Sequence, residues 1–129
     1  MSTILIVEDD ASFRRILEYR LTEAGYNTTV AEDGEKALEL FSKHRHQVVL
    51  TDLNLPELSG EEVLKQIKQQ SPDTPVIILT ALGSIESSVE AVRLGAFHCL
   101  TKPVNRDELL VTIHNAFRFS ELSGNVQEQ

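Results

Sequence analysis

Cysteine is almost absent from this chain of 129 residues, and the single cysteine, Cys99, excludes an internal disulfide. A reducing compartment, the cytoplasm, is therefore the expected location. Basic residues are also few, with 12 Lys and Arg against 20 Asp and Glu, which gives a net charge of −8 at pH 7. This charge argues against broad electrostatic binding to nucleic acid or to an anionic membrane surface. It is compatible with a local acidic cluster that takes a cation.

Long hydrophobic runs are missing as well. The first ten residues contain no basic leader, and their longest apolar run is residues 4–7. We therefore expect this segment to be neither a signal peptide nor a membrane span. The composition, with 41% hydrophobic and 25% charged residues, is that of a globular domain. A chain of this length can bury one core without disulfides or structural metal.

Short apolar runs alternate along the chain with segments of helical spacing. The runs that predict strands are residues 4–7, 28–31, 48–50, 76–79 and 97–100. In the segments between them, apolar residues recur at helical spacing, as with Leu17 and Leu21 in the first and Val89 and Val92 in the fourth. Alternating strands and helices predict a parallel sheet with helices on both faces. The run at 28–31 begins with two threonines and indicates an edge strand.

Helix boundaries can be predicted from capping residues and glycines. The expected starts are marked by Asp10, Ser59 and Asn105, and the expected ends by Gly25 and Gly95. We expect residues 1–119 to form one domain. Residues 120–129 lack an apolar stripe, and we expect a frayed tail or the start of a linker there.

Polar side chains follow the predicted strands at their carboxyl ends, which is where open parallel sheets bind ligands. These residues are Glu8 and Asp9 after the first strand, Asp52 after the third, Thr80 after the fourth and Lys102 after the fifth. Each alone has an ordinary explanation, such as a solvated loop or a surface lysine. Their conjunction predicts one site with three carboxylates, a hydroxyl and an ammonium.

The chemistry of such a site suits phosphoryl transfer. Glu8 and Asp9 come directly off a buried strand, and like charges held close together raise each other's pKa unless a cation is bound. Hard oxygen ligands favour Mg²⁺. Asp52 can act as a nucleophile, because carboxylates form acyl-phosphate intermediates. A metal ion and Lys102 would stabilise the transferring group electrostatically.

Four segments, ILIVEDDASFRRIL, VVLTDLNLPELSG, VIILTA and GAFHCLTKP, resemble in order and spacing the motifs of the receiver domain of two-component response regulators. The resemblance covers about residues 3–119. It implies a flavodoxin-like (βα)5 fold of three layers, with the strand order 2-1-3-4-5. It also implies phosphotransfer from a sensor histidine kinase or a phosphotransfer protein. Such a domain catalyses only its own phosphorylation and dephosphorylation, so it is not an enzyme that turns over an external substrate.

The resemblance implies a role for each residue that carries the reaction. Asp52 matches the phosphoacceptor. Thr80 matches the switch hydroxyl, and Lys102 matches the lysine that pairs with the phosphoryl group. A cis peptide bond is implied before Pro103, since proline is where the cis form is accessible.

The metal site is implied in the same way. Its residues are Glu8, Asp9, Asp52 and Asn54. Asp9 is the expected direct Mg²⁺ ligand of the acidic pair. Asn54 matches the position whose backbone carbonyl also binds the metal.

The family also responds to phosphorylation on one face, which implies a phosphorylation-dependent homodimer or partner contact on the fourth helix, fifth strand and fifth helix. Exposed candidates there are Arg93, His98 and Arg106. The chain departs from the family three places before the lysine, where an aromatic residue is usual and Cys99 stands here. We interpret Cys99 as a packing residue rather than a redox-reactive thiol.

Three other interpretations compete with this one. An aspartyl-phosphate hydrolase of the haloacid dehalogenase type has the pattern DxDx[TV] after its first strand, whereas Asp52 follows the third. A binding module of the same fold without phosphorylation would not need Asp52, Thr80 and Lys102 together. A nucleotide-binding Rossmann domain is disfavoured, because no G-x-G-x-x-G follows the first strand.

Overall fold

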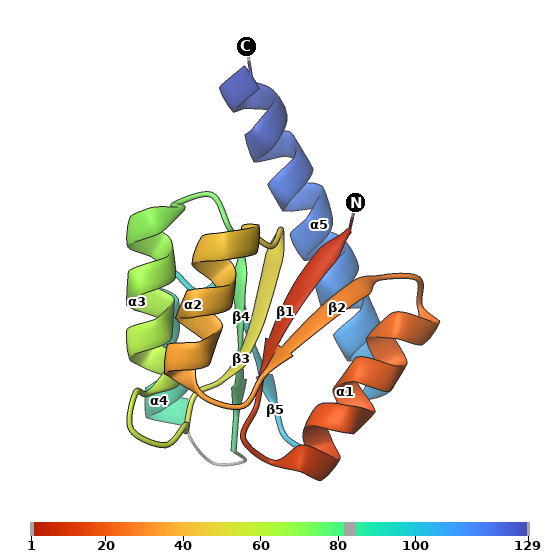
Figure 1. The fold of residues 1–129 in the computed structure, drawn as a ribbon, viewed down its shortest axis with the longest axis vertical. Coiled ribbons are helices and arrows are strands. Elements are labelled where there is room, and N and C mark those ends of the chain that lie inside the picture. The colour runs from red at the N-terminus through yellow and green to blue at the C-terminus, as the bar shows by residue number, and fades with distance from the viewer. Residues whose placement is uncertain (1, 82–84, 129) are drawn as a thin grey trace.

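The computed structural model describes residues 2–81 and 85–128, and in these residues strands and helices alternate along the chain (Figure 1). The elements in chain order are β1 (Thr3–Val7), α1 (Ala11–Glu23), β2 (Asn27–Ala31), α2 (Gly34–His44), β3 (Val48–Asp52), α3 (Gly60–Gln70), β4 (Val76–Thr80), α4 (Ile85–Arg93), β5 (His98–Thr101) and α5 (Arg106–Glu128). All strand pairs are parallel, in the order β2-β1-β3-β4-β5. This is the predicted flavodoxin-like fold, with β2 at the edge.

Helices cover both faces of the sheet and make three layers. Figure 1 shows α1 and α5 on one face, with α2, α3 and α4 on the other. Alternate strand residues face opposite layers. Ile6 of β1 belongs to the core cluster that contains Leu17 and Ile113 of α1 and α5. Leu5, one residue earlier, belongs to the cluster that contains Phe41 of α2. The apolar runs are therefore uninterrupted because both of their faces are covered.

The register brings the carboxyl ends of neighbouring strands level with one another. Asp52, the last residue of β3, pairs with Leu79 of β4. Thr51 pairs with Val7, the last residue of β1. Residues that directly follow Val7, and Thr80 at the end of β4, therefore lie at the same edge of the sheet as Asp52.

The predicted helix boundaries are confirmed. Asp10 Oδ1 accepts hydrogen bonds from the backbone N–H groups at the start of α1. Ser59 and Asn105 cap α3 and α5 in the same way. Gly25 and Gly95 follow α1 and α4 with φ of 99° and 106°, a left-handed conformation that glycine adopts at low cost.

One predicted helix face is wrong. Val89 and Val92 of α4 do not point into the core, since they are 56% and 55% exposed. Ala91 is fully buried instead, and Leu94 packs partly against the same core cluster. Apolar residues occupy more than one face of this short helix, so their spacing alone does not decide which face turns inward. The packing selects the side of Ala91 and Leu94.

Helix α5 continues through Glu128, so most of the segment 120–129 is helical rather than frayed. That this segment begins a linker stays a prediction. In Figure 1, α5 extends past the sheet at the end where the N-terminus lies, away from the carboxyl ends of the strands. Within the part of the chain described, no helix combines the length and the apolar character needed to cross a membrane.

Candidate functional site

Three carboxylates converge at the carboxyl edge of the sheet. Glu8 and Asp9 follow β1, and Asp52 ends the neighbouring strand β3. One oxygen from each lies within 4.8 Å of the others. Glu8 is fully buried and Asp52 is 4% exposed, whereas Asp9 reaches solvent. The acidic cluster therefore joins a buried pair of carboxylates to an accessible one, with the hard oxygen donors that a divalent cation prefers.

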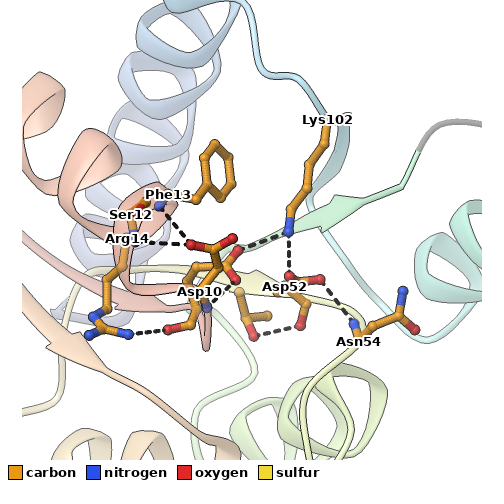
Figure 2. A network of polar contacts seen from close by, with 9 residues as sticks. Asp10, Ser12, Phe13, Arg14, Asp52, Asn54 and Lys102 are labelled. Atoms are coloured by element: carbon orange, nitrogen blue, oxygen red, sulfur yellow. Dashed lines mark hydrogen bonds and ion pairs between the residues drawn. The ribbon is translucent and has the colours of Figure 1, made fainter.

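Lys102 reaches this cluster from the turn after β5. Its Nζ donates a hydrogen bond of 2.5 Å to Asp52 Oδ2 and lies 3.0 Å from Glu8 Oε1 (Figure 2). The Lys102 backbone N–H donates a hydrogen bond to the carbonyl oxygen of Thr80, which holds the turn to β4. The implied cis peptide bond between Lys102 and Pro103 is present. One ammonium is thus shared by two carboxylates.

Backbone contacts hold Asp52 in place. Its Oδ1 accepts a 3.0 Å hydrogen bond from the backbone N–H of Asn54. Directly after it, Leu53 N–H donates to the carbonyl oxygen of Leu79, and Gly60 N–H donates to that of Leu53. A Cβ atom on Gly60 would collide with the Asp52 carbonyl oxygen and lie 2.7 Å from Leu53 Cα. The start of α3 can approach the phosphoacceptor candidate this closely only because residue 60 is glycine.

Burial dominates the electrostatics of the cluster. Burial raises the pKa of Glu8 to about 7, and the nearby Asp52 carboxylate adds to the rise, although Asp10 N–H and Lys102 partly oppose it. Burial alone would lower the pKa of Lys102, yet the hydrogen bonds and charges of Asp52 and Glu8 raise it above its ordinary value. The lysine is therefore charged at neutral pH, and Glu8 sits near its titration point.

Thr80 contributes a buried hydroxyl at the end of β4. The residue is 1% exposed, and among the described residues its Oγ1 has no hydrogen-bond partner. Burying a hydroxyl without a partner is costly. A group added beside Asp52 could accept a hydrogen bond from the Thr80 hydroxyl.

The structure brings together Glu8, Asp9, Asp52 and Lys102, with Thr80 on the neighbouring strand. Asn54 is exposed, and the contact it makes with the site is through its backbone N–H; metal binding by its carbonyl stays a prediction.

Two contributors at the site were not predicted from the sequence. The ring centroid of Phe13 in α1 lies 4.9 Å from Lys102 Nζ, and Gly60 adjoins the backbone of Asp52. The sequence signal for Phe13 is its place three residues after the cap residue Asp10, in the first turn of the predicted helix. The signal for Gly60 is a glycine directly after the cap residue Ser59.

Cys99 lies on β5 beside α4, half-buried, with its Sγ 3.6 Å from the carbonyl oxygen of Ser88. Burial raises the pKa of the Cys99 thiol. A protonated, half-buried thiol is a weak nucleophile, which agrees with the interpretation as a packing residue. His98 is exposed, as expected.

The fold and the edge cluster define a flavodoxin-like domain with an acidic, lysine-containing site. The family model for the response regulator receiver domain matches residues 4–114. The chain therefore belongs to the receiver domain family of response regulators, the regulators of two-component systems.

Individual relatives agree with this assignment. The regulatory protein AtoC of Escherichia coli K12 is 35% identical over 127 residues, which are 98% of this chain and 28% of AtoC. The probable transcriptional regulator ycf27 of Guillardia theta is 42% identical over 115 residues, 89% of this chain and 45% of that protein. The chain thus spans less than half the length of these two curated relatives. A solved receiver domain from Clostridium thermocellum has a TM-score of 0.91 at 31% identity, covering 95% of this chain and 98% of that one.

Proposed function

We propose that this receiver domain is a phosphorylation switch in which Asp52 accepts a phosphoryl group from the phosphohistidine of a sensor histidine kinase or a phosphotransfer protein. The observation that supports this most strongly is the placement of Asp52. Its carboxylate is nearly buried, fixed by the Asn54 N–H, and held by a charged lysine beside an acidic pair. A rigid carboxylate next to cationic groups is suited to nucleophilic attack on phosphorus.

Mg²⁺ fits the donor set of the acidic cluster. Asp9, Asp52 and the Asn54 carbonyl would hold it, with Glu8 assisting through water. Support comes from the three carboxylate oxygens within 4.8 Å, two of which belong to buried residues whose negative charges repel each other. When bound, the metal ion supplies positive charge to the phosphoryl oxygens. Asp9, the exposed member of the cluster, gives an ion access from solvent.

The chain's own residues divide the remaining work. An Asp52 oxygen forms the bond to phosphorus while the phosphorus–nitrogen bond of the donor breaks, and the electron pair leaves with the imidazole. Lys102, now on Asp52 Oδ2, would follow the negative charge onto a phosphoryl oxygen. Thr80 Oγ1, which is buried and unpartnered among the described residues, would donate to another. Loss of the phosphoryl group by hydrolysis resets the switch.

A second copy of the chain or a protein partner would recognise the phosphorylated state at the face formed by α4, β5 and α5. A groove of about 380 Å³ lies there, lined by Ser88, Val89, Val92, Arg93, His98 and Cys99. Its exposed valines and basic rim suit a second copy of the chain or a protein partner. We expect no direct nucleic-acid or membrane binding by this domain, and a cytoplasmic location.

A test of the proposal is labelling with acetyl phosphate and Mg²⁺, followed by mass mapping. Asp52 should carry an acid-stable, alkali-labile phosphoryl group, and Asp52→Asn should lose it. Asp73→Asn, a carboxylate in the loop after α3, is the control and should label normally. Unlabelled Asp52 would favour a binding module of the same fold. Turnover of small phosphate esters would favour the hydrolase alternative.

A further inference from the structure

We propose that Phe13 is a positioning residue for Lys102, in which the face of its ring holds the lysine ammonium over Asp52 by a cation–π interaction. The inference rests on the proposed phosphoryl transfer at Asp52, and it adds a residue that acts on the lysine rather than on the phosphoryl group. Figure 2 draws the Phe13 ring on the Lys102 side of the acidic cluster.

The geometry lies within the range of this interaction. Lys102 Nζ is over the ring, 4.9 Å from its centroid, and attraction to an aromatic face is significant to about 6 Å. The position of the ring is also fixed by its surroundings. Phe13 is in the first turn of α1, its backbone N–H donates to the capping Asp10 Oδ1, and its side chain packs against the core cluster of that face.

A flexible lysine needs such a support at this position. Its side chain is 29% exposed, and a four-carbon stem has many rotamers that carry the ammonium into solvent. Glu8 and Asp52 hold it now, but their charges change during the reaction. The Asp52 carboxylate becomes an acyl phosphate, and bound metal would compete for both carboxylates. The quadrupole of the ring stays the same throughout, so Phe13 can retain the ammonium over the site while the charge moves outward.

Packing alone is the competing explanation, since Phe13 is half-buried against apolar residues. The two explanations differ in their dependence on ring electronics. Fluorine atoms on the ring withdraw charge from its face and weaken cation attraction, while they change its shape little and leave it apolar. A role in packing alone would not depend on these fluorine atoms.

The experiment places 4-fluoro-, 3,5-difluoro- and 3,4,5-trifluorophenylalanine at position 13 and measures the phosphorylation rate of Asp52 with acetyl phosphate and Mg²⁺. We expect a stepwise fall that reaches between about 2-fold and 30-fold for the trifluoro ring, the range of this interaction. The melting temperature should stay unchanged or rise. Phe13→Leu should be slow and Phe13→Tyr should keep most of the rate. The trifluoro ring at Phe119, which contacts Phe97 instead, is the matched control and should leave the rate unchanged.

A second readout does not depend on phosphorylation. In the metal-free protein, the Lys102 ε-protons should be shifted upfield by the Phe13 ring current, and Phe13→Leu should abolish this shift. A flat rate across the fluorinated series, or unshifted ε-protons, would overturn the role of Phe13 while labelling of Asp52 stands. If the shift is present but Asp52 of the wild-type chain never labels, the proposed function fails and only the contact remains.

Discussion

Gly60 is the residue where the backbone of α3 comes nearest to Asp52. We expect Gly60→Ala to destabilise the domain by about 1–3 kcal/mol or more, because its Cβ would overlap the Asp52 carbonyl oxygen and the main chain has to shift. Phosphorylation should slow in this variant, since the displaced strand end carries Asp52, the proposed acceptor. Urea unfolding and acetyl phosphate labelling measure both effects. Gln69→Ala, on an exposed position of the same helix, is the control. Wild-type stability in Gly60→Ala would mean that the contact relaxes freely.

Glu8 should make the stability of the domain depend on pH. Its pKa is about 7 in the folded chain against an ordinary 4.5, so the folded state holds the proton more tightly than the unfolded state. The stability of the metal-free protein should therefore fall as the pH rises from 4.5 to 7. The loss is at most about 3.5 kcal/mol, from a difference of about 2.5 between the two pKa values at about 1.4 kcal/mol per pKa unit.

Unfolding measured across this pH range, with and without Mg²⁺, checks the prediction for Glu8. Glu8→Gln should remove the slope, and Mg²⁺ should reduce it in the wild type because the cation favours the ionised carboxylate. The exposed Glu23→Gln should keep the slope. A slope that survives in Glu8→Gln would assign the pH dependence to another group.

At the scale of the elements, the loop between α3 and β4 is held in place by hydrogen bonds from Lys68. Lys68 Nζ donates to the carbonyl oxygens of Pro72 and Thr74 at 2.9 and 3.0 Å. We expect Lys68→Met to cost about 1–3 kcal/mol, because it keeps the apolar stem but leaves the buried end of the loop without its donor. Denaturant unfolding gives the difference. Lys65→Met, exposed one turn earlier, should change stability little, and an equal loss in both variants would contradict the role of the ammonium.

The elements also show how far the sequence could predict this molecule. The buried strands were predictable because runs such as residues 76–79 are apolar at every position, and the site followed because a parallel sheet brings its carboxyl ends together. The inward face of α4 was not predictable, because Val89, Ala91 and Val92 offer two apolar sides. The contact of Phe13 with Lys102 was not predictable either, because the two residues are distant in sequence and their contact depends on side-chain direction.

At the scale of the whole molecule, Cys99 of β5 lines the groove beside α4, and the same strand leads to Lys102 at the acidic cluster. We expect its small side chain to couple the groove weakly to Asp52. An aromatic ring would move an apolar surface on the order of 150–250 Å² in and out of that groove, and a thiol moves far less. Cys99→Tyr should therefore enlarge the change in self-association or partner binding that beryllofluoride, a phosphoryl mimic, produces.

Sedimentation or titration calorimetry with and without beryllofluoride compares Cys99→Tyr with wild type. Cys99→Ser is the control for loss of the thiol alone and should behave as wild type. If tyrosine leaves the beryllofluoride effect no larger, the coupling of this face does not depend on the residue at position 99. The sequence ALGSIESS, with Gly83 and three serines, predicts a segment at the start of α4 that is easy to rearrange, and residues 82–84 of it lie outside the described residues.

Helix α5 begins four residues after Lys102 and is 23 residues long, which makes it a rod of about 35 Å at 1.5 Å per residue. Its base lies near the edge where Lys102 meets Asp52, and its tip lies past the opposite end of the sheet (Figure 1). The first half of this helix packs into the core, where Leu109, Ile113 and Phe117 are buried, so a rigid tilt would pivot within that packed half. For the residues beyond Phe117, a length of about 16 Å at 1.5 Å per residue, a tilt of about 5° would displace the tip by about 1.4 Å. A small change in how the packed half seats on the sheet would therefore be largest at the helix tip.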